Sequence, residues 1–115
     1  MKNIGFIGIG LMGFPMAKNL LKSGYNLKAY NRSQDKAVRL REFGAEISIS
    51  IKEVVTNSDV IITMLTDDEA VEKVMGGDDF ISNLKESATV IDMSSVSPVI
   101  TKKYAENQYK TLFHS

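Results

Sequence analysis

Three glycines near the N-terminus have the spacing that points most directly to chemistry. Gly8, Gly10 and Gly13 form the pattern G-x-G-x-x-G between the short apolar run 4–7 and a stretch with helical periodicity. The first glycine permits a tight turn out of a strand, the second leaves the backbone open to a ligand, and the third lets a helix pack closely on the strand. The free N–H groups at the start of that helix would bind phosphate oxygens. The spacing therefore predicts a phosphate-binding turn with six expected contacts: Gly8, Ile9, Gly10, Leu11, Met12 and Gly13.

A dinucleotide is the ligand that such a turn favours when it lies between a strand and a helix. The helical stretch carries apolar side chains on one face, at Met12, Met16 and Leu20, so it can pack on a sheet. Two alternatives stay open on the residues alone. The turn could be purely structural, or it could bind another nucleotide-type ligand such as S-adenosylmethionine.

The end of the second predicted strand bears on the choice between NAD and NADP. In a dinucleotide fold an acidic residue there, about twenty residues past the glycines, binds the ribose 2′-hydroxyl of NAD, whereas an arginine accommodates the 2′-phosphate of NADP. The chain reads Tyr30-Asn31-Arg32-Ser33 at this point, without a carboxylate. Arg32 offers a planar fork of donors, and Asn31 and Ser33 could add uncharged hydrogen bonds. The sequence favours NADP over NAD. In the alternative that involves no cofactor, Arg32 is a solvated loop residue and Ser33 is a helix N-cap.

A longer pattern surrounds these residues. Residues 8–20 read GIGLMGFPMAKNL, Gly24 follows, and residues 92–98 read DMSSVSP. This pattern resembles the N-terminal signature of the β-hydroxyacid dehydrogenases, which include 3-hydroxyisobutyrate dehydrogenase, tartronate semialdehyde reductase and the glyoxylate/succinic semialdehyde reductases. The resemblance implies an NADP-dependent oxidoreductase that interconverts a small 3-hydroxy acid, or 2-hydroxy acid, with its semialdehyde or keto acid. Members with Asn-Arg-Ser/Thr after the second strand resemble the NADP-preferring reductases.

Two further loops are expected beside the cofactor, because ligands bind outside the carboxyl ends of parallel strands. In the family that it resembles, the first loop lines the adenosine and phosphate side, and Thr66 here replaces a common proline. The second loop matches a Ser-Thr pair near the nicotinamide and the substrate, so Ser95 is expected to contact the cofactor; turn and N-cap chemistry is the alternative. Val71, one turn into the next helix, could pack on adenine or in the core. The loop residues are Met64, Leu65 and Thr66, then Ser94 and Ser95.

Apolar runs alternate with helical patterns along the whole chain, which predicts a βαβ series. The expected fold class is α/β, a Rossmann-type doubly wound parallel sheet. Strands are expected at 2–7, 27–31, 45–47, 59–65 and 88–93, and helices at 11–22, 34–43, 51–56, 67–75, 80–84 and 98–109.

Composition excludes several classes of function. The 115 residues carry 14 basic and 14 acidic side chains, so nothing indicates binding to nucleic acid or to a membrane surface. There is no cysteine, and the single histidine, His114, lacks the partners of a metal site. No apolar run approaches the roughly 20 residues that cross a bilayer. The first strand leaves no room for a signal peptide, which predicts the cytoplasm; an organelle stays open if a transit peptide has been removed.

The resemblance also shows what this sequence lacks. The family uses a catalytic lysine in a G-x-x-G-x-G-x-x-x-K-x-x-N segment and binds substrate through D-A-P-V-S-G-G; neither occurs here. We therefore expect one NADP-binding domain, 1–115, without the family's helical C-terminal domain, truncated before its later strands and without a catalytic residue of its own. Exposed sheet and helix surfaces then predict self-association or a homo-oligomer. The alternatives are a non-enzymatic dinucleotide-binding module and the Rossmann domain of a 6-phosphogluconate dehydrogenase-like or imine reductase-like enzyme; resemblance over residues 15–20 argues against the enzymes.

Overall fold

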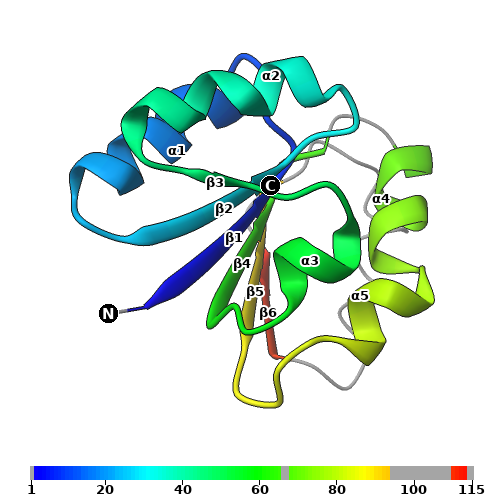
Figure 1. The fold of residues 1–115 in the computed structure, drawn as a ribbon. Helices are drawn as coiled ribbons and strands as arrows, with labels where there is room; N and C mark the ends of the chain where they lie inside the picture. Colours follow the sequence, from blue (N-terminus) through cyan, green and yellow to red (C-terminus); the bar gives the residue numbers. More distant parts are fainter. Residues whose placement is uncertain (1, 66–67, 94–109, 114–115) are drawn as a thin grey trace.

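Six parallel strands form a single sheet in a computed structural model that describes residues 2–65, 68–93 and 110–113 (Figure 1). The spatial order is β3-β2-β1-β4-β5-β6, which is the strand order of dinucleotide-binding sheets. The expected doubly wound α/β fold is therefore confirmed. The strands are β1 (Asn3–Ile7), β2 (Asn26–Tyr30), β3 (Glu46–Ile47), β4 (Val60–Thr63), β5 (Thr89–Asp92) and β6 (Lys110–Phe113).

Helices cover the two faces of the sheet, and each face has its own apolar core (Figure 1). On one face, helices α1 and α2 and the 3₁₀-helix η1 pack around Phe6 and Leu40. On the other face, α3, α4 and α5 pack around Ile61 and Phe80. Burial of these side chains from water holds the layers together. The helices are α1 (Gly13–Lys22), α2 (Gln34–Val38), η1 (Arg39–Phe43), α3 (Ile51–Val55), α4 (Asp68–Met75) and α5 (Asp78–Ser82).

Two elements differ from the expectations, and a third is not tested. The predicted helix 34–43 divides at residue 38 into α2 and η1, which ends at Gly44 in the left-handed region. The strand predicted over 59–65 is shorter, because only Val60–Thr63 pairs with its neighbours. The helix predicted over 98–109 lies outside the described residues.

A sixth strand was not among the strands predicted from the sequence, and the expected truncation of the domain before its later strands stays a prediction. The structure pairs β6 with β5 in parallel, from Thr89 opposite Lys110 to Asp92 opposite Phe113. Residues 110–113 read Lys-Thr-Leu-Phe and lack the continuous apolar run that indicates a strand buried on both faces. Pairing with β5 defines this strand, and the local pattern gives little sign of it.

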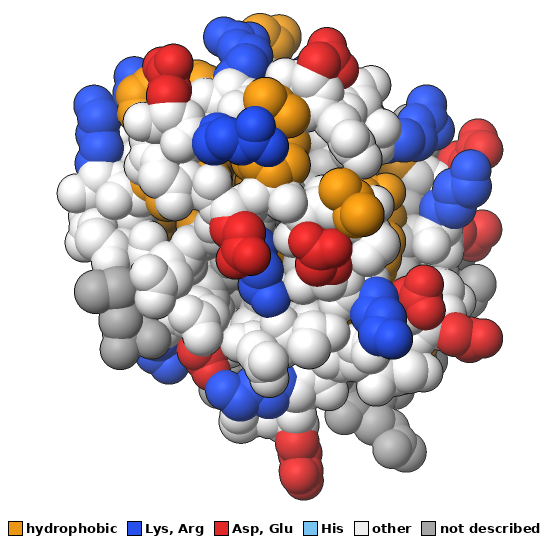
Figure 2. Space-filling model, viewed as in Figure 1, with side chains coloured by type: hydrophobic (Ala, Val, Ile, Leu, Met, Phe, Trp, Pro, Cys, Tyr) orange, Lys and Arg blue, Asp and Glu red, His pale blue; other side chains and the backbone are white. Residues whose placement is uncertain are grey.

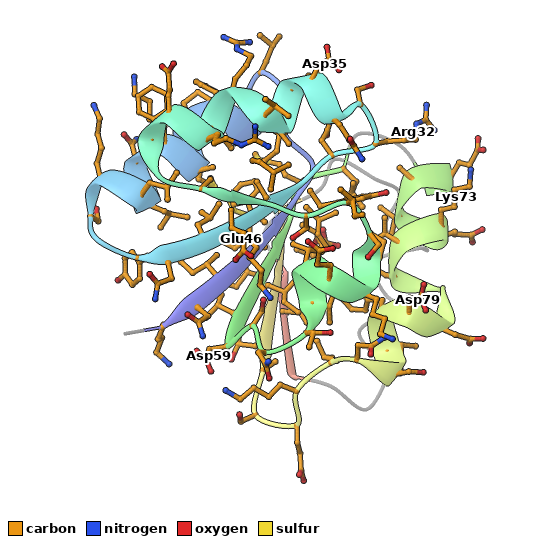
Figure 3. All side chains as sticks on the ribbon, viewed as in Figure 1. Arg32, Asp35, Glu46, Asp59, Lys73 and Asp79 are labelled. Atoms are coloured by element: carbon orange, nitrogen blue, oxygen red, sulfur yellow. The ribbon has the colours of Figure 1, made fainter. Side chains whose placement is uncertain are left out.

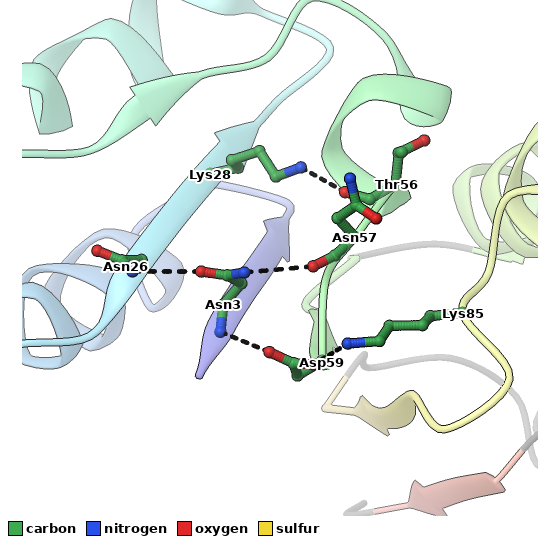
Figure 4. A network of polar contacts seen from close by, with 7 residues as sticks. All are labelled: Asn3, Asn26, Lys28, Thr56, Asn57, Asp59 and Lys85. Atoms are coloured by element: carbon green, nitrogen blue, oxygen red, sulfur yellow. Dashed lines mark hydrogen bonds and ion pairs between the residues drawn. The ribbon is translucent and has the colours of Figure 1, made fainter. Parts of the chain in front are cut away.

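The amino-terminal edge of the sheet carries a network of paired polar groups (Figure 4). The Asn3 backbone N–H donates to Asp59 Oδ2 at 2.9 Å, and the Lys85 ammonium pairs with Asp59 Oδ1. The Asn3 side chain accepts from Asn26 Nδ2 at 3.2 Å and donates to the Asn57 carbonyl at 3.5 Å. The hydrogen bond from Asn3, together with Lys85, holds the pKa of Asp59 below its ordinary value. This network joins the start of β4 to β1 and β2.

Candidate functional site

The glycine-rich turn after β1 is fixed by contacts that the fold itself requires. Gly8 has φ = +101°, and a Cβ atom there would lie 2.3 Å from the Met64 carbonyl oxygen. Its N–H donates to the Tyr30 carbonyl at 3.0 Å, so the turn is tied to the end of β2. A Cβ atom on Gly13 would lie 2.4 Å from the Gly8 carbonyl oxygen, which places α1 directly against the turn. Glycine is therefore needed at both positions for the chain to fold this way.

Gly10 is different, because nothing lies within 4 Å of the position that its Cβ atom would occupy. The residue is exposed, and its φ is outside the range that glycine alone favours. The fold would accept a side chain here, so the fold does not explain this glycine. The open space does fit a pyrophosphate that approaches the backbone, which is the task predicted for the second glycine.

Helix α1 begins directly after this space. No side chain within the described ranges caps its N-terminus, and its first turn carries no acidic residue. Its positive end is therefore available to an anion. Leu11 and Met12, which precede the helix, are 95% and 71% exposed.

Asn31 joins the turn to the connection after β2. Its Oδ1 accepts the Ile9 N–H at 2.8 Å, and its Nδ2 donates to the Ser33 carbonyl at 2.9 Å. The sequence predicted a hydrogen bond from Asn31 to the cofactor, and that role stays a prediction. Its positioning role was missed, because it depends on a contact across 22 residues.

A cleft of about 380 Å³ opens at the carboxyl ends of β1, β2 and β4. The sides of the cleft come from the glycine turn, the connection after β2, the segment after β4, and helices α2, α3 and α4. Of the predicted site residues, eight line it: Gly8, Ile9, Gly10, Asn31, Arg32, Ser33, Met64 and Leu65. Ile7, Tyr30, Lys36, Ile51, Ala70, Lys73 and Val74 complete the lining.

Other predicted residues lie elsewhere. Leu11 lines a smaller hollow, together with residues of α1, α2 and η1. Met12 and Gly13 do not line the main cleft. Thr66, Ser94 and Ser95 lie outside the described residues.

Two open questions about side-chain roles are answered by the structure. Val71 is fully buried in the core, so the adenine contact considered for it is not supported. Ala70 and Val74 on the same helix line the cleft instead. Ser33 occupies the N-cap position of α2, but its side chain makes no capping hydrogen bond there. The cleft therefore retains a hydroxyl that the helix does not use.

The cleft differs in charge from the rest of the molecule. Figure 2 shows cationic and anionic side chains interspersed over the face in view, and the chain as a whole is neutral. Among the described residues that line the cleft, three are cationic and none is acidic. The three are Arg32, Lys36 and Lys73, and the described part of the chain gives none of them an ion-pair partner.

Only Arg32 of these three was predicted as a cofactor contact. Lys36 lies in α2, just after the connection 31–33, but Arg32 precedes this helix, so helical spacing does not relate the two residues. Lys73 reaches the cleft only because α4 packs beside the end of β4, and no local signal indicates this.

Comparison with known proteins identifies the family. Residues 3–114 match the model of the NAD binding domain of 6-phosphogluconate dehydrogenase. The chain belongs to this family. The mitochondrial 3-hydroxyisobutyrate dehydrogenase of Mus musculus is 39% identical over 93% of this chain and 32% of its own length. This chain thus spans about a third of the length of such relatives.

Solved structures show the same fold. A Mycobacterium tuberculosis 3-hydroxyisobutyrate dehydrogenase with L-serine has a TM-score of 0.88 and 27% identity, over 98% of this chain and 39% of that one. An imine reductase from Myxococcus stipitatus in complex with NADP+ has a TM-score of 0.86 and 24% identity, over 98% of this chain and 40% of that one. A variant of that reductase is in complex with NAD+, at 21% identity and a TM-score of 0.88, over 98% of this chain and 40% of that one. The imine reductases show likeness of fold only.

No helix among the described residues is long and apolar enough to span a membrane.

Proposed function

We propose that this chain is the NADP(H)-binding domain of a β-hydroxyacid dehydrogenase-like oxidoreductase. The observation that carries the proposal is the space at Gly10, which the fold does not need and a pyrophosphate would fill. The turn residues 8–13 would hold the pyrophosphate, and the connection 31–33 would hold the adenosine ribose. Met64 and Leu65 would line the adenosine side, with Thr66 beside them.

The choice of NADP rests on Arg32. It lines the cleft after β2, where an NAD-binding fold would place a carboxylate. Asp35, the nearest acidic residue along the chain, lies in the first turn of α2 and does not line the cleft (Figure 3). NAD remains the alternative cofactor, since the family model is described as NAD-binding.

The cofactor would supply hydride chemistry, and this chain would bind and orient it. We propose that the full-length protein interconverts a small 3-hydroxy acid, or 2-hydroxy acid, with its semialdehyde or keto acid. The name of the mouse relative, 3-hydroxyisobutyrate dehydrogenase, supports a 3-hydroxy acid. Ser94 and Ser95 are the proposed substrate-side residues, with Ser95 also touching the cofactor. No catalytic residue is assigned within this chain.

Two further proposals concern the setting of the protein. We place it in the cytoplasm, although the mouse relative is mitochondrial by name. We also propose that the chain self-associates or forms a homo-oligomer, because β6 has no partner on its outer edge within the described sheet. Sedimentation velocity that shows only monomer at high concentration would contradict the second proposal.

Calorimetric titration with NADPH and NADH tests the binding function. We expect NADPH to bind more tightly, and Arg32→Ala to weaken NADPH binding by about 2 kcal/mol while changing NADH little. Arg41→Ala is the matched control, because Arg41 is an exposed arginine of η1 that does not line the cleft. Equal binding of both cofactors would contradict the choice of NADP, and binding of neither would contradict the proposed function of this domain.

A further inference from the structure

Lys73 brings a cation to the nucleotide cleft from a different element than Arg32 and Lys36. It lies in the last turn of α4, whereas the other two come from the connection after β2 and the start of α2. Figure 3 shows Arg32 and Lys73 on the same side of the molecule, on these separate elements. The cleft is thus lined with positive charge from both the β2 side and the α4 side.

The face of α4 that lines the cleft explains how Lys73 reaches it. Ala70, Lys73 and Val74 are spaced i, i+3 and i+4, so they share one face of the helix, and all three line the cleft. Ala70 and Val74 supply an apolar surface, along which the lysine stem can lie while its ammonium stays exposed. This arrangement fits a ligand that has an apolar nucleobase with a charged group at the edge of that nucleobase.

Two structural explanations compete with a ligand role for Lys73. One is an ion pair with Glu69, one turn earlier on α4, which is the favourable order for such a pair. The ion pairs found among the described residues do not include it. The other is attraction to the negative end of the α4 dipole. That attraction acts at any position around the last turn, so it does not account for the side that faces the cleft.

We propose that Lys73 is a specificity-determining residue that recognises the 2′-phosphate of an adenosine nucleotide together with Arg32. This inference rests on the proposed function and adds α4 to the elements that select the cofactor. A 2′-phosphate carries close to two negative charges and three acceptor oxygens, more than one guanidinium can satisfy. A second cation on the α4 side would bind the oxygens that Arg32 leaves.

The test uses 2′,5′-ADP and 5′-AMP as probes, because the two differ only in the 2′-phosphate. We expect Lys73→Gln to weaken 2′,5′-ADP binding roughly fivefold and to change 5′-AMP binding less than about twofold, as for an exposed charge pair. Lys73→Arg should keep the preference, since it keeps the charge. Lys22→Gln is the matched control: Lys22 is the exposed cation in the last turn of α1, away from the cleft. Thermal melts of all variants show whether Lys73→Gln lowers the melting temperature, as the loss of its attraction to the dipole of α4 would.

The outcomes separate this inference from the proposed function. Equal weakening of both probes by Lys73→Gln, or no weakening of either, would show that Lys73 does not read the 2′-phosphate. If Lys73→Gln has no such selective effect but Arg32→Ala abolishes the preference for 2′,5′-ADP, the choice of NADP stands and only the role of Lys73 is wrong. If the unchanged chain shows no preference between the probes, the choice of NADP and the role of Lys73 are both wrong.

Discussion

Polar side chains at the amino-terminal ends of the parallel strands have partners within the protein, whereas the cleft cations at the carboxyl-terminal ends have no ion-pair partner in the part of the chain that the structure describes. At the amino-terminal edge, the side chains of Asn3, Asn26, Asp59 and Lys85 are hydrogen-bonded or paired within the chain (Figure 4). Lys28, nearby on β2, donates to the Glu53 and Thr56 carbonyls at the end of α3. Both of these lysines, Lys28 and Lys85, have partners within the protein itself.

At the carboxyl-terminal edge, Arg32, Lys36 and Lys73 line an open cleft without an ion pair among the described residues. Gly10 leaves space that the fold does not use, and α1 starts there without a side-chain cap. The comparison teaches that polar groups which satisfy one another serve the fold, whereas a cluster of one charge beside open backbone indicates a ligand. The same comparison can be made between two glycines of one turn.

The largest expected effect is on stability, at Gly8. Gly8→Ala places a Cβ atom against the Met64 carbonyl in a backbone conformation with φ = +101°. We expect a loss of about 3 kcal/mol in the free energy of unfolding, from strain and overpacking together. Urea denaturation followed by circular dichroism measures it. A variant as stable as the parent would show that the turn can rearrange.

The second effect separates binding from folding, at Gly10. Gly10→Ala meets no atom of the protein within 4 Å, so we expect the free energy of unfolding to change by less than about 0.5 kcal/mol. Binding of NADPH should nonetheless fall by roughly tenfold or more, because the methyl group would occupy pyrophosphate space. Calorimetry on the same sample measures the binding. Unchanged affinity would remove the main support for a phosphate at this turn.

The smallest expected effect is on the melting temperature, at Asp59 in the amino-terminal polar network, and it depends on pH. The pKa of Asp59 lies below its usual value of 3.8, through the Asn3 N–H and then Lys85. A carboxylate with a lowered folded-state pKa stabilises the protein above its unfolded pKa, and this contribution is lost as the pH falls through the folded-state pKa. We expect Asp59→Asn to lower the melting temperature near neutral pH, and the difference from the parent to shrink below about pH 4.

Glu46→Gln serves as the control for this pH series. Glu46 is an exposed carboxylate on β3, and none of the hydrogen bonds or ion pairs found in the described ranges involves its side chain. The melting temperature of this variant should follow that of the parent across the series. A difference between Asp59→Asn and the parent that stays constant down to strongly acidic pH would contradict the assigned role of Asp59.

Local patterns predicted most of the fold and the centre of the candidate site. The strand–turn–helix context identified Gly8, Gly10 and Gly13, and the apolar runs identified β1, β2, β4 and β5. The helix expected over 51–56 is present as α3, and the Glu53 N–H donates to Ser50 Oγ at 3.1 Å at its N-terminus, as the spacing of a serine and a glutamate three residues later favours. These features depend on neighbours in sequence, so the sequence alone reveals them.

The features that were missed depend on tertiary contacts. Strand β6 is defined by its register against β5, and Lys73 by the packing of α4. Asn31 has two partners, and its 2.8 Å bond to Ile9 crosses from β2 to the turn after β1. A polar residue at a strand end predicts a ligand contact or a positioning contact equally well, and only the fold shows where its amide points.

Asn31 also has a consequence for how ligand recognition is divided. Because its amide holds Ile9 and Ser33 at once, the turn after β1 and the connection after β2 form one preorganised surface. The conformational entropy of fixing the two segments relative to each other is lost when the chain folds and not when a nucleotide arrives. The pyrophosphate and the adenosine ribose would therefore bind to one surface, whose two segments are already fixed relative to each other.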